Sequence, residues 1–205
     1  MQVFRHINQK YSPSFLTIGN YDGIHLGHQA ILKKLISESK SNNILSSVMT
    51  FEPHPREFFS PKLAPKRIIS LREKLEYFDE LKIDQVFIVN FNDEFSRKSY
   101  LDFIEILKKN IQAKKIIIGN DFRFGKQREG NIDKLIDNSV DVCVMNKIEY
   151  KGERVSSTII RDSLAAGDLK RAAMLLGRSY SISGKVVHGD KRGREIGFPT
   201  ANIHM

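Results

Sequence analysis

The stretch GNYDGIHLGH, residues 19–28, decides the expected fold because a strand-like pattern ends there and a helical pattern begins. Residues 15–18 (FLTI), just before it, have the apolar character of a buried strand. After it, apolar residues recur at helical spacing to about residue 40. Ligands of open α/β sheets bind beyond the carboxyl ends of strands, and amide groups at the start of the next helix attract phosphate. The stretch therefore predicts a phosphate-binding junction.

Two histidines in this stretch are candidates for chemistry. His25 and His28 are three residues apart and would face the same side at the start of a helix. As hydrogen-bond donors, they could stabilise charge that builds up on phosphate oxygens. Gly27 would let the backbone approach the ligand closely. The alternative is two histidines that merely cap the helix, which the glycines and the strand-to-helix setting disfavour. A metal site is less favoured, because no further His or Cys falls at ligand spacing.

Strand-like and helical segments continue to alternate up to residue 150. Further strands are predicted at residues 44–51, 86–89, 116–118 and 140–145, and further helices at residues 70–81 and 100–109. The alternation predicts an α/β fold with a parallel sheet and helices on both faces. Beyond residue 150, helices are predicted at residues 156–166 and 168–176, and a strand-like pattern begins at residue 180.

The composition excludes several classes of protein. Of the 205 residues, 40% are hydrophobic, which is enough for a packed core and excludes a wholly disordered chain. The apolar runs span a handful of residues, whereas a membrane-spanning helix needs about 20. Cys143 is the single cysteine and can form neither an internal disulfide nor a cysteine-rich zinc site. Because no secretory signal is visible at the N-terminus, we expect a cytoplasmic protein.

The formal net charge of the chain is 33 − 24 = +9, which favours anionic partners. A nucleic-acid-binding module is one candidate for such a chain. However, no nucleic-acid motif is present, and the basic residues are scattered between acidic ones. We therefore expect no nucleic-acid partner and no membrane partner, while the oligomeric state stays open.

Two more motifs follow predicted strands and indicate a flavin or nucleotide pocket. FEPHP, residues 51–55, forms a rigid turn with two prolines, with a plain strand-ending turn as the alternative. In GNDFRFG, residues 119–125, an aromatic ring could stack on a planar ligand and Arg123 could meet a phosphate. The alternative is a loop that tucks its rings into the core. The predicted pocket residues are Phe51, Pro53, His54, Asn120, Asp121, Phe122, Arg123 and Phe124.

SSTIIR, residues 156–161, begins a predicted helix with three hydroxyl side chains. Such side chains can simply cap the helix by accepting hydrogen bonds from its first amide groups. They could also ligate phosphate oxygens, with Arg161 one turn further on adding positive charge.

Two of these motifs resemble the signatures of the nucleotidyltransferase superfamily, HxGH at residues 25–28 and SSTxxR at residues 156–161. In order and spacing, all four motifs look like the FMN adenylyltransferase module of the bacterial bifunctional FAD synthetase family, from about residue 15 to residue 177. Tyr21 stands where that family usually has phenylalanine. The resemblance implies a Rossmann-like nucleotidyltransferase fold that transfers AMP from ATP to FMN, giving FAD and pyrophosphate, with Mg²⁺ as cofactor.

The resemblance also implies residue roles, in a mechanism of positioning and charge stabilisation without a covalent enzyme intermediate. His25, His28 and Arg161 would be catalytic. ATP and its phosphates would be bound by Gly19, Asn20, Tyr21, Asp22, Gly27, Ser156, Ser157 and Thr158. A nucleotidyltransferase of the same fold with another substrate, such as a cytidylyltransferase, is the runner-up. A non-catalytic flavin-binding protein is a further alternative, but it would not need both phosphate signatures.

Residues 184–202 resemble the opening of the riboflavin kinase domain. The resemblance implies a partial kinase site at Gly189, Gly193, Thr200 and Asn202, with Thr200 and Asn202 at the kinase Mg²⁺. That domain is a small β-barrel, which two strands cannot close, and most of its strands would follow Met205. We therefore expect a transferase domain at residues 1–178, an incomplete kinase segment at residues 179–205, and no phosphorylation of riboflavin by this chain.

Overall fold

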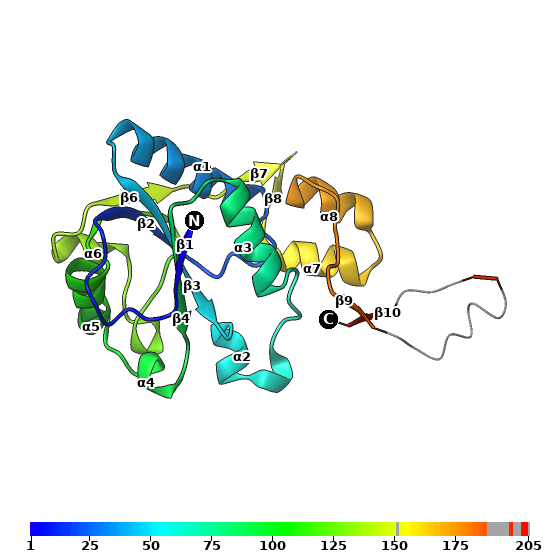
Figure 1. The fold of residues 1–205 in the computed structure, drawn as a ribbon, viewed down its shortest axis with the longest axis horizontal. Coiled ribbons are helices and arrows are strands. Elements are labelled where there is room, and N and C mark those ends of the chain that lie inside the picture. The colour runs from blue at the N-terminus through cyan, green and yellow to red at the C-terminus, as the bar shows by residue number, and fades with distance from the viewer. Residues whose placement is uncertain (151, 188–196, 199–201, 205) are drawn as a thin grey trace.

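A six-stranded sheet forms the centre of the computed structural model, which describes residues 1–150, 152–187, 197–198 and 202–204 (Figure 1). Its strand order is β1-β4-β3-β2-β5-β6, and each neighbouring pair is parallel. The strands are β1 (Gln2–Phe4), β2 (Ser14–Ile18), β3 (Leu45–Glu52), β4 (Gln85–Asn90), β5 (Ala113–Gly119) and β6 (Val142–Met145). The predicted α/β fold with a parallel sheet is confirmed.

The strand order creates a switch point between β2 and β5. From β2 the chain crosses to β3 and β4 on one side, and it continues with β5 on the other side of β2. Ligand crevices of open α/β sheets form at such points, beyond the carboxyl ends of the strands. The motifs at residues 19–28, 51–55 and 119–125 follow or overlap the ends of β2, β3 and β5, so they meet at this edge.

Helices cover both faces of the sheet, as predicted. One face packs against α1 (Leu26–Ser41), α3 (Leu71–Glu80), α7 (Ser157–Ala165) and α8 (Leu169–Leu176). The other face packs against α5 (Tyr100–Glu105), the π-helix η2 (Ile106–Asn110) and α6 (Ile132–Asp137). Adjacent residues of β2 point to opposite faces, so Phe15 belongs to the first core and Leu16 to the second. This two-sided burial explains why all five residues of β2 are buried.

Shorter elements connect this framework. They are α2 (Pro55–Phe59), the 3₁₀ turns η1 (Pro61–Leu63) and η3 (Lys126–Arg128), α4 (Asp93–Ser96), and the antiparallel pairs β7 (Glu149–Tyr150) with β8 (Glu153–Arg154) and β9 (Lys185–Val187) with β10 (Asn202–His204). Local chemistry fixes several ends. Ser70 and Glu73 form a capping box at the start of α3, and Gly167 and Gly177 have φ angles of +73° and +70° after α7 and α8.

Several predicted boundaries differ from the structure. The helix predicted at residues 100–109 is α-helical only to Glu105 and continues as the π-helix η2. The strand predicted at residues 140–145 begins at Val142. The strand-like pattern from residue 180 forms a strand only over Lys185–Val187. The three-residue edge strand β1 was not predicted, because it is too short to show a periodic pattern.

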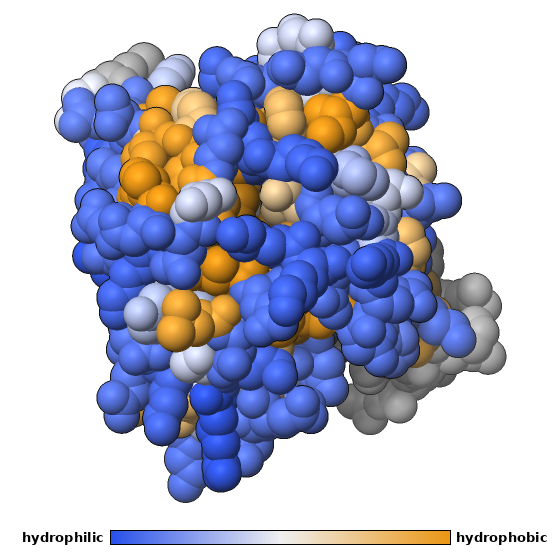
Figure 2. All heavy atoms as spheres, turned by 90° about the vertical axis from the view of Figure 1, so that its left-hand side faces the viewer, coloured by the Kyte–Doolittle hydropathy of each residue, from blue (hydrophilic) through white to orange (hydrophobic). Residues whose placement is uncertain are grey.

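On the face shown in Figure 2, apolar side chains gather in separate patches that hydrophilic side chains divide. Over the part of the chain that the structure describes, none of the helices has both the length and the apolar content of a membrane span.

Candidate active site

A cleft of about 1060 Å³ opens at the carboxyl ends of β2, β3 and β5. It brings together all the residues predicted for the transferase site except Pro53, which does not line it. The members that line it are Gly19, Asn20, Tyr21, Asp22, His25, Gly27, His28, Phe51, His54, Asn120, Asp121, Phe122, Arg123, Phe124, Ser156, Ser157, Thr158 and Arg161. Four motifs far apart in the sequence thus share one cavity.

His25 and His28 stack on each other at the N-terminus of α1. Their ring centroids are 3.6 Å apart and their planes differ by 15°. His25 is the N-cap of α1, and its Nδ1 accepts a hydrogen bond from the His28 amide at 3.3 Å. His25 therefore caps the helix, as the alternative to a catalytic role predicts. This does not exclude chemistry, because the cap uses Nδ1 and leaves Nε2 of the ring available.

Burial keeps both imidazoles neutral. It lowers the pKa of His25 from its ordinary value of 6.5 to about 4. The pKa of His28 is held well below its ordinary value, mainly by burial and also because protonation of His28 is disfavoured beside His25 and Lys74. In a neutral His25 whose Nδ1 accepts a hydrogen bond, Nε2 carries the proton. His25 therefore offers a neutral N–H donor at the N-terminus of α1.

This pKa shift predicts a loss of stability in acid. The unfolded state binds a proton on His25 below about pH 6.5, whereas the folded state does not bind it until about pH 4. The free energy of unfolding therefore decreases as the pH is lowered from about 6.5 to about 4. We expect His25 to account for a loss of about 3 kcal/mol over this interval. Urea unfolding of wild type and His25→Asn, which retains a capping group, measures it at several pH values. Parallel pH profiles of the two proteins would contradict the prediction.

Gly27 serves the histidine pair directly. A Cβ atom at position 27 would lie 3.2 Å from Cε1 and from Nδ1 of His25, which is tighter than ordinary contact. The predicted reason for this glycine is close approach of the backbone to a ligand. The structure adds a second reason, because a side chain at position 27 would crowd the His25 ring.

Tyr21 stands behind the pair as a core residue. It is 1% exposed, and its hydroxyl group lies 2.6 Å from Oγ1 of Thr17. The ring packs edge-on against Phe78 and lies 5.0 Å from the ring of His28. This position can hold tyrosine in place of phenylalanine, because Thr17 provides a hydrogen-bond partner for the additional hydroxyl group. The side chain predicted to bind ATP is thus placed to support His28.

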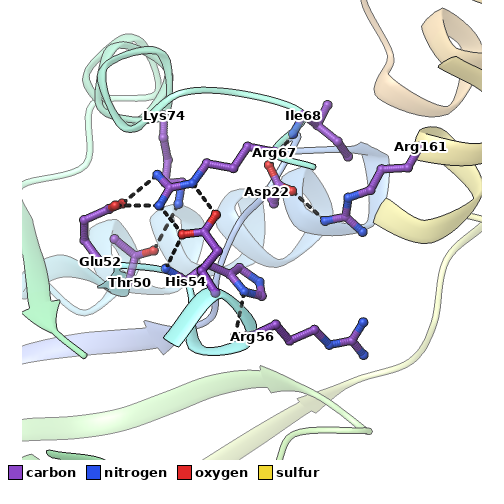
Figure 3. A network of polar contacts seen from close by, with 10 residues as sticks. Asp22, Thr50, Glu52, His54, Arg56, Arg67, Ile68, Lys74 and Arg161 are labelled. Atoms are coloured by element: carbon purple, nitrogen blue, oxygen red, sulfur yellow. Dashed lines mark hydrogen bonds and ion pairs between the residues drawn. The ribbon is translucent and has the colours of Figure 1, made fainter. Parts of the chain in front are cut away.

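Asp22 and Arg161 form a buried ion pair that joins the first and last motifs (Figure 3). Oδ2 of Asp22 accepts a hydrogen bond from Nη2 of Arg161 at 2.6 Å, and Oδ1 accepts bonds from the amides of Ile68 and Ile69 at 2.9 and 3.3 Å. Arg161 also donates through Nε to the carbonyl of Lys66. Three protein donors therefore engage the Asp22 carboxylate at the edge of the cleft, and its predicted role in ATP binding stays a prediction.

The three hydroxyl residues at the start of α7 make different contacts. Ser156 is the N-cap and accepts a hydrogen bond from the amide of Ile159 at 3.3 Å, as the capping alternative required. Ser157 donates to the carbonyl of Asp22 at 2.9 Å, which ties α7 to the loop after β2. Thr158 lines the cleft beside them. The N-termini of α1 and α7 therefore meet in the same cavity.

Aromatic side chains form another part of the cleft wall. Phe122 and Phe124 stack with centroids 5.5 Å apart, and Phe124 is 7% exposed against Phe103 in the core. The core alternative therefore applies to Phe124, whereas Phe122 is half-buried at the cleft. Phe51 contacts Phe91 and Phe95, and Phe59 in α2 is 64% exposed. The aromatic surface is thus broader than the two motifs indicated.

Charged residues, most of them outside the four motifs, interact around the end of β3 (Figure 3). Arg67 pairs with Glu52 at 2.6 Å and with Glu57, while Glu57 accepts a hydrogen bond from the amide of His54. His54 caps α2, so the FEPHP turn is also a helix start. Lys74 is 6% exposed, its Nζ lies 3.4 Å from Oγ1 of Thr50, and burial lowers its pKa. No local sequence signal separates these residues from an ordinary helix or loop surface.

The cleft carries a positive rim. Its lining includes several basic residues besides Arg161, namely Arg56, Lys98, Arg123, Arg128, Lys147 and Arg154. Arg154 also pairs with Asp121 at 3.3 Å. Positive charge around a concave site favours an anionic ligand.

The part of the chain that the structure describes contains no group of three or more His, Cys, Asp or Glu side chains arranged for a metal ion. Of the predicted kinase residues, Gly189, Gly193 and Thr200 lie outside the described residues, and Asn202 lies exposed in β10. The partial kinase site therefore stays a prediction.

Comparison with known proteins agrees with the motifs. The family model of FAD synthetase matches residues 7–159, and that of riboflavin kinase matches residues 176–205. A bifunctional riboflavin kinase/FMN adenylyltransferase of Buchnera aphidicola subsp. Schizaphis graminum is 44% identical over 95% of this chain and 64% of its own length. The protein of that name in Escherichia coli K12 is 44% identical over 93% and 62%, and that in Haemophilus influenzae is 39% identical over 100% and 69%. The chain thus spans less than two thirds of the Buchnera and Escherichia proteins.

Solved structures agree on the fold. A Streptococcus pneumoniae crystal structure described as a macrolide-efflux protein has a TM-score of 0.80 and 26% identity, covering 98% of this chain and 68% of that chain. Pantothenate synthetase from Thermus thermophilus, at 11% identity, has a TM-score of 0.50, covering 86% of this chain and 81% of that chain. The family matches, together with a cleft that gathers the motifs on which the resemblance was based, show that this chain belongs to the FAD synthetase family.

Proposed function

We propose that this chain transfers AMP from ATP to FMN, giving FAD and pyrophosphate. The observation that carries the proposal is the stacked, neutral pair of His25 and His28 at the N-terminus of α1, in one cleft with the hydroxyl-rich start of α7. Two helix N-termini in one cavity suit a triphosphate. The names of the similar proteins support the same activity.

In the proposed reaction, a phosphate oxygen of FMN attacks the α-phosphorus of ATP. The new P–O bond forms as the bond to pyrophosphate breaks, so negative charge shifts onto the pyrophosphate. Donors from His25 and His28 would stabilise charge on the α-phosphate oxygens during this step. Their neutrality means that they act as fixed donors and do not need to lose a proton. The proposed role of the protein is therefore positioning and electrostatics.

The β- and γ-phosphates would lie at the start of α7. Ser157 and Asp22 hold this helix start against the loop after β2, and Thr158 and Arg161 face the same cavity. Arg161 is already paired with Asp22, so its net positive contribution is smaller than that of a free guanidinium. The exposed basic rim would supply the remaining positive charge.

The isoalloxazine ring would bind at the aromatic wall. Phe51 and Phe122 line the cleft, and planar rings pack favourably on such faces. Mg²⁺ would enter with the triphosphate, because Mg²⁺ is commonly held by substrate phosphates and one or two carboxylates. This fits a cleft whose described residues provide no ready-made metal cage.

The proposal is tested by incubating the chain with FMN, ATP and Mg²⁺ and separating the flavins by chromatography. We expect FAD to accumulate, and replacement of ATP by CTP to abolish the product. A flavin–cytidine product formed in preference to FAD would identify a cytidylyltransferase instead. No FAD from a folded chain would refute the proposed activity.

The division into a transferase domain at residues 1–178 and a kinase segment at residues 179–205 belongs to this proposal. The two family matches, which end at residue 159 and begin at residue 176, support it. We also propose a cytoplasmic location and no nucleic-acid or membrane partner. Riboflavin phosphorylation by these 205 residues is not expected. FMN formed from riboflavin and ATP by this chain would refute that expectation.

A further inference from the structure

The loop between β2 and α1 has an unusual backbone. Tyr21 and Ile24 have φ angles of +50° and +38°, in the left-handed region that non-glycine residues rarely adopt. Ile24 is β-branched and 1% exposed, so its position is fixed within the core. Such strained residues persist only when the surrounding structure holds them. Because His25 follows Ile24 directly, whatever holds this turn also sets the histidine pair.

Arg178 holds this turn from far along the chain. Its Nη2 donates to the carbonyl of Gly23 at 2.8 Å, and its Nη1 donates to the carbonyls of Ile24 and Leu176 at 3.2 and 3.3 Å. The guanidinium group lies 4.1 Å from the centroid of the Tyr77 ring on α3. One planar side chain therefore joins the loop after β2, the end of α8 and α3.

Neighbouring contacts reinforce the same junction. Nε2 of Gln29 donates to the carbonyls of Ile24 and Leu176 at 2.9 and 2.8 Å. Gly177 has a φ of +70°, and a Cβ atom there would lie 2.6 Å from the side chain of Leu26. The end of α8 thus sits directly on the first turn of α1, with no room for a larger residue between them.

We propose that Arg178 is a positioning residue for the transferase cleft, which fixes the carbonyls of Gly23 and Ile24 and thereby orients His25 at the N-terminus of α1. Arg178 lies beyond residues 7–159, which match FAD synthetase, and within residues 176–205, which match riboflavin kinase. A residue of the second matched segment therefore supports the turn that precedes the histidine pair. In its kinetic consequences, this inference rests on the proposed function.

The chemistry requires arginine at this position. The guanidinium group is planar and rigid, so it can reach two adjacent carbonyls while stacking on Tyr77. A lysine ammonium is a single point of positive charge on a flexible stem and cannot reproduce that fork. Replacement by lysine therefore separates the geometric role of Arg178 from its charge.

The test compares Arg178→Ala, Arg178→Lys and the control Arg171→Ala. Arg171 lies within α8, pairs with Glu153 and does not line the cleft. We expect Arg178→Ala to lower kcat for FAD formation by about 10- to 100-fold, because small misplacements of catalytic groups have effects of this size. The KM for ATP should change by less than about threefold, since the contact orients the histidine and binds no substrate. Arg178→Lys should remain impaired, and Arg171→Ala should retain wild-type kcat.

Hydrogen exchange supplies a readout that does not depend on activity. The amides of Ile24 and His28 are bonded within the turn, to the Tyr21 carbonyl and to Nδ1 of His25. Both amides should exchange faster in Arg178→Ala and Arg178→Lys, while the amides of the central strands keep wild-type protection.

The outcomes distinguish the two proposals. If wild type forms no FAD but the Arg178 variants loosen the turn, the proposed activity fails and the positioning role stands. Wild-type kcat and wild-type amide protection in the folded Arg178→Lys variant would overturn the positioning role, whether or not Arg178→Ala folds. An equal loss of kcat in Arg171→Ala would also overturn it.

Discussion

Replacing His28 by alanine is expected to lower kcat for FAD formation by about 10²- to 10³-fold, the effect of removing one preorganised donor from a charge-stabilising site. The KM for ATP should change little, because the donor acts mainly on charge that develops in the transition state. The ring of His28 stacks on His25 and has a strongly lowered pKa, so it is a neutral, fixed group in wild type. Steady-state kinetics with FMN and ATP measure both parameters.

A matched control is His6→Ala, since His6 is exposed and does not line the cleft. It should retain the wild-type kcat and KM. A rise in KM with an unchanged kcat for His28→Ala would instead assign His28 to ground-state binding and contradict its proposed role.

Replacing Asp22 by alanine is expected to lower the free energy of unfolding by about 3–5 kcal/mol, the range found when one partner of a buried ion pair is removed. The Asp22 and Arg161 side chains are only 8% and 18% exposed, so the charge left on Arg161 would be poorly solvated. The amides of Ile68 and Ile69 would also lose their acceptor. Urea unfolding at pH 7 measures the change.

The control for this prediction is Glu76→Ala, which removes the exposed ion pair with Arg72 and should change stability by less than about 1 kcal/mol. In an Arg161→Met background, Asp22→Ala should be less destabilising, because the unpaired cation is absent. A loss as small as that of Glu76→Ala in the wild-type background would contradict the account of the pair.

The framework of the fold was predictable because its signals are local. The junction from β2 to α1 shows a switch from an apolar run to helical spacing, and the capping box of Ser70 and Glu73 marks the start of α3 in the sequence itself. The edge strand β1 and the π-helical end of α5 were missed, since a three-residue strand and a change of helical hydrogen bonding leave no periodic trace.

The gathering of the site was predictable for a different reason. The carboxyl ends of parallel strands lie at one edge, so motifs that follow β2, β3 and β5 had to meet. The contacts that each side chain makes within the site were not predictable. Asp22 and Arg161 are 139 residues apart, and nothing in their spacing indicates that they neutralise each other. The same holds for Arg178, whose partners are backbone carbonyls of a distant loop.

The bond that we propose this cleft to form joins the α-phosphate of ATP to the phosphate of FMN. ATP radiolabelled at the α-phosphate, incubated with FMN, Mg²⁺ and the chain, tests that bond directly. We expect α-labelled ATP to give labelled FAD, and γ-labelled ATP to give label only in pyrophosphate. Unlabelled flavin with a folded chain, or γ-label in the flavin product, would contradict it.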